Sequence, residues 1–188
     1  MKRAIVVHQW GANPSRDWHP WLKGQLEEKG FEVLVPEMPD TDAPEIDKWV
    51  GRLAEVVGKA SKDTILIGHS VGCQTILRYL QTLGTGERVN KVVLVAPWLE
   101  LSSEVMQEPA YGPLAKSWLE TPIDWDKVKQ HSDSFTCFFS KDDPYVPIAN
   151  AEIFGKLLGA KIIIEDDMGH YEDDSNVKEV PQVLKEII

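Results

Sequence analysis

The chain has 188 residues, 43% of them hydrophobic, which is enough for one buried core and too few for two ordinary domains. Its formal net charge of −10 and its scattered Lys and Arg residues exclude nucleic acid as the expected partner. No stretch approaches the roughly 18 consecutive apolar residues of a membrane span or the pattern of a signal peptide. Cys73 and Cys137 each lie in an apolar segment, which favours reduced core thiols. We therefore expect one cytoplasmic domain over residues 1–188, with no membrane partner.

Short apolar runs alternate along the chain with longer segments of helical period, which is typical of repeated βα units. The runs predict six strands, at Ala4–His8, Phe31–Val35, Thr64–Ile67, Val92–Ala96, Phe135–Phe139 and Lys161–Ile164. The helical patterns lie at Trp18–Lys29, Ile46–Lys59, Val71–Leu83, Ala149–Leu158 and Val177–Ile187. Because the strands are apolar on both faces, we predict an α/β fold with a doubly wound, mainly parallel six-stranded sheet and helices on both faces.

Residues 97 to about 125 show no regular pattern and are rich in large apolar side chains. A connection of this length inside a compact domain is commonly a lid or a binding loop. We therefore expect a short lid-like insertion here. Trp98 and Trp118 from this segment, together with His8 at the end of the first strand, are the candidate residues of a substrate pocket.

The segment Gly68-His69-Ser70-Val71-Gly72 follows the third predicted strand and opens a helical pattern. This is the G-x-S-x-G motif in its strand-turn-helix context. Glycine is needed on either side because longer side chains would collide in so sharp a turn. The turn projects the Ser70 hydroxyl into a cleft, and the following helix N-terminus offers N–H groups to a developing oxyanion. We predict that Ser70 is a nucleophile and that the Val71 N–H is one oxyanion donor.

A serine hydroxyl becomes an effective nucleophile only when a neighbouring base accepts its proton. His170 is the best candidate base, since it lies in the loop after the last predicted strand, at the same sheet edge as Ser70. The other four histidines fit less well: they are expected at a strand end (His8), in the protein interior (His69) and at the surface (His19 and His131).

The third member of a triad is a carboxylate that fixes the histidine tautomer, and in this kind of fold it lies between Ser and His in the chain. Asp142 and Asp143 follow the fifth predicted strand. Pro144 biases Asp143 toward an extended conformation, so we prefer Asp143 to Asp142. The remaining acidic residues near His170 are interpreted as a solvated rim: Glu165, Asp166, Asp167, Glu172, Asp173 and Asp174.

The second oxyanion donor is expected in the loop after the first strand. That loop reads His8-Gln9-Trp10-Gly11. Either Gln9 or Trp10 would supply the N–H group, and the sequence leaves both alternatives open.

Together these motifs resemble the retinoblastoma-binding serine hydrolase-like family of small serine hydrolases, within the α/β-hydrolase superfamily. The resemblance covers nearly the whole chain and rests on Trp18–Leu22, Met38–Asp40, Gly68–Ser70, Ile76–Tyr79, Asp142–Pro144 and Gly169–His170. It implies a minimal α/β-hydrolase fold, no metal or organic cofactor, and Ser70, Asp143 and His170 as nucleophile, acid and base. One departure is His8-Gln9, where many superfamily members have His-Gly.

The leading hypothesis is a serine hydrolase that cleaves a small carboxylic ester, thioester or amide through an acyl-enzyme on Ser70. Its partner is then a small-molecule acyl substrate, with a preference for short acyl groups because the lid-like segment is short. The alternative is a non-catalytic protein-binding module with an idle triad, in which the Trp-rich segment forms the interface. A nucleotide binder is disfavoured, since the turn at Ser70 lacks a phosphate-binding glycine loop and its lysine.

Overall fold

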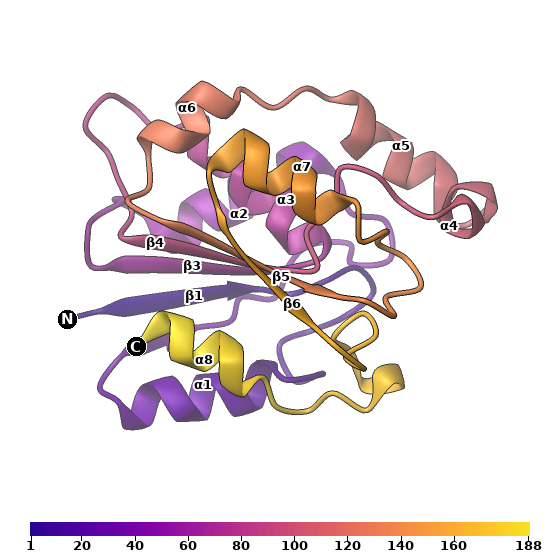
Figure 1. The fold of residues 1–188 in the computed structure, drawn as a ribbon. Helices are drawn as coiled ribbons and strands as arrows, with labels where there is room; N and C mark the ends of the chain where they lie inside the picture. Colours follow the sequence, from indigo (N-terminus) through magenta and orange to yellow (C-terminus); the bar gives the residue numbers. More distant parts are fainter.

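The structure is a computed structural model that describes all 188 residues. Its centre is a six-stranded sheet in the order β2-β1-β3-β4-β5-β6, and all neighbouring strands are parallel (Figure 1). The strands are β1 Arg3–Val7, β2 Glu32–Leu34, β3 Thr64–His69, β4 Lys91–Val95, β5 Phe135–Ser140 and β6 Lys161–Glu165. All the predicted strands are present and no end is displaced by more than two residues. The predicted α/β class with a parallel sheet is confirmed.

Helices cover both faces of the sheet, as predicted. One face carries α1 (His19–Glu28) and α8 (Pro181–Ile187); the other carries α2 (Ile46–Val57), α3 (Val71–Leu80), α6 (Trp125–Gln130) and α7 (Asn150–Leu158) (Figure 1). A 3-10 turn, η1, spans Asp173–Ser175. None of these helices is both long enough and apolar enough to cross a membrane. Cys73 and Cys137 are buried free thiols, in agreement with the expectation of core cysteines.

Consecutive residues of β1 face opposite sides of the sheet, because side chains alternate along a strand. Ile5 and Val7 belong to an apolar cluster shared with α2, α3 and α7, whereas Ala4 and Val6 belong to a cluster shared with α1 and α8. Since both faces are covered, the central strands β1, β3, β4 and β5 are buried except at Arg3 and Lys91, where β1 and β4 begin. This explains why their sequences are continuously apolar and do not alternate with polar residues.

The order of the strands reverses next to β1. The chain passes from β1 outward to β2 and then returns to place β3 on the other side of β1. Ligand sites in open parallel sheets form at the carboxyl ends of the strands beside such a reversal. Val7 of β1 is in register with Gly68 of β3, and His69 of β3 is in register with Val95 of β4. Ser70, which follows His69, therefore lies in the middle of this edge.

The segment at residues 97–125 is not irregular, so this part of the sequence interpretation is wrong. It contains two short helices, α4 (Ser103–Gln107) and α5 (Gly112–Glu120), before α6 begins at Trp125. The Ser102 side chain caps α4 by accepting a hydrogen bond from the Val105 N–H. Gly112 packs closely against α4 where α5 starts, since a Cβ there would lie 2.3 Å from the Met106 carbonyl oxygen. Helices this short show too few periods to be recognised in a sequence.

Candidate active site

Ser70 occupies a strained turn between β3 and α3. Its φ of 52° and ψ of −116° lie in a region that non-glycine residues seldom adopt, at a cost of about 1–3 kcal/mol. The neighbouring glycines make the turn possible. A Cβ at Gly68 would lie 2.8 Å from the Cys73 nitrogen, and a Cβ at Gly72 would lie 2.2 Å from the Val7 carbonyl oxygen. The steric reason inferred for the spacing of the motif is therefore present in the packing.

Three N–H groups beside Ser70 make no hydrogen bond within the protein. Val71 is the first residue of α3, so its N–H has no partner inside the helix. The N–H groups of Gln9 and Trp10, in the loop after β1, are also unbonded. All three predicted oxyanion donors are therefore free to bind a negatively charged oxygen.

The loop after β1 is fixed by two buried side chains. The Met38 N–H donates to His8 Nε2 over 3.3 Å, so Nδ1 carries the proton that is donated to the Gln9 carbonyl oxygen at 2.8 Å. Burial lowers the pKa of His8, which keeps this imidazole neutral. On the other side, Gln9 Nε2 donates to Asp17 Oδ2 at 2.5 Å. His8 thus orients the loop and does not line the cavity, contrary to its expected place in the pocket.

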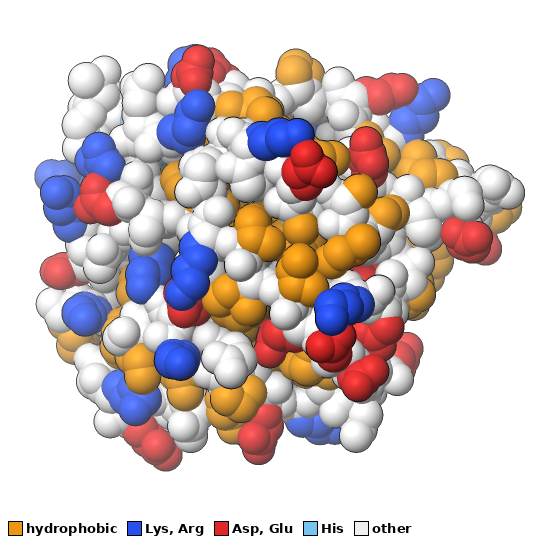
Figure 2. Space-filling view, viewed as in Figure 1, with side chains coloured by type: hydrophobic (Ala, Val, Ile, Leu, Met, Phe, Trp, Pro, Cys, Tyr) orange, Lys and Arg blue, Asp and Glu red, His pale blue; other side chains and the backbone are white.

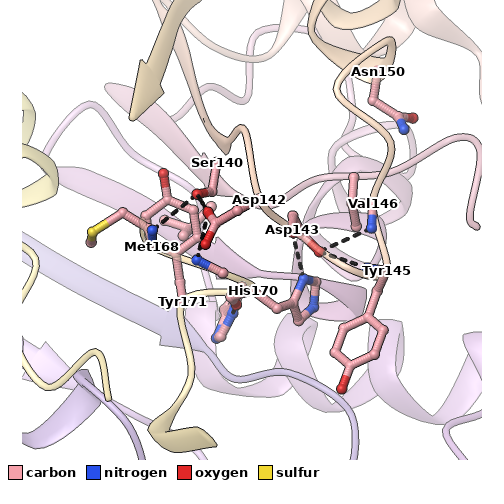
Figure 3. A network of polar contacts seen from close by, with 12 residues as sticks. Ser140, Asp142, Asp143, Tyr145, Val146, Asn150, Met168, His170 and Tyr171 are labelled. Carbon is pink, nitrogen blue, oxygen red and sulfur yellow. Dashed lines mark hydrogen bonds and ion pairs between the residues drawn. The ribbon is translucent and has the colours of Figure 1, made fainter. Parts of the chain in front are cut away.

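His170 and Asp143 form a buried pair. His170 Nδ1 lies 2.8 Å from Asp143 Oδ2, and the two side chains are only 6% and 2% exposed. Asp143 Oδ1 accepts the N–H groups of Tyr145 at 2.9 Å and Val146 at 3.0 Å (Figure 3). One carboxylate oxygen is therefore held by the turn after β5, and the other is directed at the imidazole.

Asp142 contacts the backbone of the histidine loop and makes no hydrogen bond to the imidazole ring. Its Oδ1 accepts the Ser140 hydroxyl at 2.5 Å and the Gly169 N–H at 3.1 Å (Figure 3). The Ser140 hydrogen bond lowers the pKa of Asp142. Ser140 Oγ also accepts the Met168 N–H at 3.0 Å. The two adjacent aspartates thus hold different parts of the same loop.

The backbone at His170 and at the next residue is held by two buried side chains. His69 Nε2 donates to the His170 carbonyl oxygen at 2.8 Å, and Trp18 Nε1 donates to the Tyr171 carbonyl oxygen at 3.0 Å. His69 points into the protein, as expected, and burial lowers its pKa well below the ordinary value. A neutral His69 is the form that suits its buried position.

Ser70 and His170 line the same cavity, which has a volume of about 570 Å³. The Ser70 hydroxyl and His170 Nε2 make no hydrogen bond in the structure, and both atoms are accessible from the cavity. Hydrogen bonds of this kind often tighten only when a substrate is bound. The other lining residues are Gln9, Trp10, Gly11, Ala12, Arg16, Asp42, Trp98, Leu101, Val105, Ala110, Tyr111, Tyr145, Glu172 and Asp174.

A sequence model of the serine hydrolase family matches residues 4–187. The chain belongs to the serine hydrolase family. It is 28% identical to the serine hydrolase RBBP9 of Rattus norvegicus, over 99% of this chain and 95% of that protein. The crystal structure of the ydeN gene product of Bacillus subtilis superposes with a TM-score of 0.90 at 24% identity, over 100% of this chain and 97% of the other. The resemblance found in the sequence is confirmed.

More distant solved structures share the fold. Est1E of Butyrivibrio proteoclasticus, in a structure with ferulic acid bound, superposes with a TM-score of 0.75 at 15% identity. That alignment covers 100% of this chain and 88% of Est1E. At this level of identity the likeness describes the fold alone.

The cavity of this member of the serine hydrolase family has a rim that is more acidic than basic. Asp42, Glu172 and Asp174 line the cavity, whereas Arg16 is its one basic residue. Glu172 is half-buried without an ion-pair partner, and burial raises its pKa. Figure 2 shows acidic side chains gathered over the region where β6 ends. The rim predicted from the sequence therefore includes two carboxylates that face the cavity.

No group of three or more His, Cys, Asp or Glu side chains is arranged to hold a metal ion.

Besides His8, three sequence expectations about individual residues are wrong. Trp98 lines the cavity, but Trp118 is a core residue whose Nε1 donates to the Pro44 carbonyl oxygen. His19 and His131 are buried and not at the surface. Residues that the sequence analysis did not select, above all Tyr111 and Tyr145, complete the wall. Tyr111 lies in the Trp-rich segment and Tyr145 lies two residues after Asp143, so the positions of these tyrosines in the sequence were the only signal available.

Proposed function

We propose that this member of the serine hydrolase family cleaves a carboxylic ester, thioester or amide with a small acyl group, through an acyl-enzyme on Ser70. The observation that carries the proposal is that a serine on a strained turn and a buried His-Asp pair open into one cavity. Strain of this kind is maintained where it serves a mechanism. A binding module with an idle triad would have no use for it.

In the proposed reaction His170 Nε2 accepts the Ser70 proton while Oγ attacks the carbonyl carbon of the substrate. The hydrogen bond between Nδ1–H and Asp143 holds the reactive tautomer and stabilises the imidazolium. The N–H of Val71, with that of Gln9 or Trp10, binds the oxyanion. His170 then protonates the leaving group. In the second half, His170 deprotonates a water molecule that attacks the acyl carbon. The bond to Ser70 Oγ then breaks, the acid leaves, and His170 returns the proton to Oγ.

The size of the cavity supports a preference for short acyl groups. Its space of about 570 Å³ is shared by the acyl group, the leaving group and water. The wall residues from α4 and the loops beside it are Leu101, Val105 and Ala110. They are exposed or half-buried, so this part of the wall is open to solvent. We expect p-nitrophenyl acetate and butyrate to be hydrolysed with a higher kcat/KM than the decanoate. A clear preference for the long chain would contradict this size limit.

A fluorophosphonate probe tests the proposed nucleophile directly, since it reacts with an activated serine. We expect wild-type protein to be labelled and Ser70→Ala to remain unlabelled, with turnover of p-nitrophenyl butyrate reduced by a factor on the order of 10⁶. Ser132→Ala is a matched control, because Ser132 is buried and does not line the cavity. An unlabelled wild-type protein without esterase activity would favour the idle-triad alternative.

A further inference from the structure

Three residues follow one another at four-residue intervals at the start of and along α3: Ser70, Gln74 and Arg78. Residues four apart lie on the same face of an α-helix. Gln74 and Arg78 are only 1% and 2% exposed, which is unusual for such polar side chains. The proposed reaction uses neither of them. The face of α3 that begins with the candidate nucleophile therefore continues as a buried polar seam.

Arg78 is a buried cation without a carboxylate partner. Its Nη2 donates to the carbonyl oxygens of Trp118 at 2.5 Å and Thr121 at 2.7 Å. Both carbonyls lie at the C-terminal end of α5, where unpaired carbonyl groups carry the negative end of the helix dipole. The guanidinium also packs over the Trp118 ring, 5.5 Å from its centre. Burial lowers the pKa of Arg78 to about 10, so the group is charged at neutral pH and the end of α5 balances that charge.

Gln74 joins this arginine to the wall of the cavity. Its Oε1 accepts a hydrogen bond from Arg78 Nη1, and its Nε2 donates to the carbonyl oxygen of Trp98. Trp98 lines the cavity. One turn beyond Arg78, Gln81 Oε1 accepts the Asp124 N–H at 2.8 Å. The start and the end of the segment at residues 97–125 are thus both attached to the helix that follows Ser70.

We propose that Gln74 and Arg78 are positioning residues that fix the Trp98 wall and the α4–α5 segment relative to Ser70, and so set which acyl groups the cavity accepts. Arg78 holds the C-terminal end of α5, and Tyr111 at the N-terminal end lines the cavity. If the C-terminal end of α5 moved, the helix would shift and Tyr111 would leave the space where an acyl group binds. Because acyl selectivity is its readout, this inference rests on the proposed function.

Gln74→Glu tests the attachment of Trp98 with little risk to the fold. The new carboxylate still accepts a hydrogen bond from Arg78 and supplies the negatively charged partner that the arginine lacks. However, it places an oxygen against the Trp98 carbonyl oxygen, so the hydrogen bond to Trp98 is lost. We expect Ser70 to be labelled by a small fluorophosphonate at the wild-type rate. We expect KM for p-nitrophenyl butyrate to rise about fivefold to tenfold with kcat retained, the effect of losing one hydrogen bond, and KM for the acetate to change less.

Arg78→Met tests the attachment of α5, with cleavage at Lys116 by a lysyl endopeptidase as a readout independent of catalysis. Lys116 is exposed on α5. We expect cleavage to be faster than in wild-type protein by about tenfold. The matched control is Arg88→Met, because Arg88 bonds Ser132 and Asp133 and does not contact the segment. Should Arg78→Met not fold, Arg78→Lys keeps the charge, loses one carbonyl contact and is expected to show an intermediate rate.

Two results would overturn the inference. One is a Gln74→Glu protein in which kcat falls by the same factor for both esters while KM is unchanged. The other is equal cleavage at Lys116 in Arg78→Met and Arg88→Met. A wild-type protein that neither hydrolyses esters nor reacts with the probe would refute the proposed function instead, and the cleavage comparison would still decide whether Arg78 holds the segment.

Discussion

Two regions meet at the cavity, and they are built in different ways. The proposed reactive edge consists of the turns after β3, β5 and β6, where Ser70, Asp143 and His170 each lie within a few residues of a strand end. One part of the cavity wall comes from the segment at residues 97–125. Its helices α4 and α5 are short and are attached to α3 through Arg78 and through Gln81 at the end of that helix. The groups of the proposed triad are therefore placed by the sheet, whereas the shape of the cavity depends on contacts between remote parts of the chain.

The adjacent aspartates give the sharpest test of the reactive edge. In Asp143→Asn the amide would donate to His170 Nδ1 and select the wrong tautomer, so we expect kcat to fall about 10⁴-fold. In Asp142→Asn the side-chain oxygen still accepts from Ser140 and Gly169, so we expect a loss of at most about tenfold. Hydrolysis of p-nitrophenyl butyrate measures both. Equal losses would contradict the different roles assigned to the two residues.

Glycine substitutions compare the rigidity of the two regions. Gly72→Ala would place a Cβ 2.2 Å from a β1 carbonyl oxygen that cannot move, and we expect it to cost about 3 kcal/mol of unfolding free energy or more. Gly112→Ala would clash equally with the Met106 carbonyl oxygen, but α4 buries none of its side chains and is able to shift. We expect about 1 kcal/mol or less there.

Urea unfolding measures both glycine variants. Gly51→Ala on α2 is the control, because a Cβ there meets nothing within 4 Å, and alanine should stabilise the helix by about 0.5–1 kcal/mol. A Gly112→Ala protein as unstable as Gly72→Ala would show that the segment is as rigid as the sheet edge.

The same difference explains what the sequence predicts well. The strands and the places of Ser70, Asp143 and His170 follow from local patterns at strand ends, so neighbouring residues were enough to find them. Trp98 and Trp118 look alike in sequence, yet one lines the cavity and the other is held in the core by the Pro44 carbonyl oxygen. That choice depends on how α5 packs against α2 and α3. The hydrogen bonds of Gln74 and Arg78 could not be predicted from the sequence either, since their backbone partners lie more than twenty residues away.

His19 was expected at the surface, and its burial predicts acid sensitivity near the reactive edge. Both its ring nitrogens are buried without a hydrogen bond, and burial lowers its pKa from 6.5 to about 3. Between these values the unfolded chain binds a proton that the folded protein does not. The free energy of unfolding therefore falls as the pH drops below about 6.5, by up to about 1.4 kcal/mol per pH unit from this group.

His19→Leu removes that titrating group without removing a hydrogen bond. We expect the variant to show a shallower loss of stability between pH 6.5 and pH 4 than wild-type protein, measured by urea unfolding at each pH. His8 and His69 also have lowered pKa values, so some acid sensitivity should remain. Parallel curves for the two proteins would show that His19 does not contribute.

The smallest expected effect is that of substrate charge on kcat/KM, which would arise from carboxylates in the cavity wall and not from the residues of the reactive edge. Asp42, Glu172 and Asp174 face the cavity against Arg16 alone, so an acyl group with a terminal carboxylate should be repelled. We expect the p-nitrophenyl half-ester of succinate to have a kcat/KM about fivefold below that of the uncharged butyrate ester, and this difference should become smaller as salt is added.

Glu172→Gln should also reduce the difference in kcat/KM between the two esters, because this carboxylate is half-buried and less screened by solvent. The control Glu120→Gln lies outside the cavity and should leave the difference unchanged. Equal rates for the two esters in wild-type protein would mean that substrate selection lies in the shape of the wall and not in its charge.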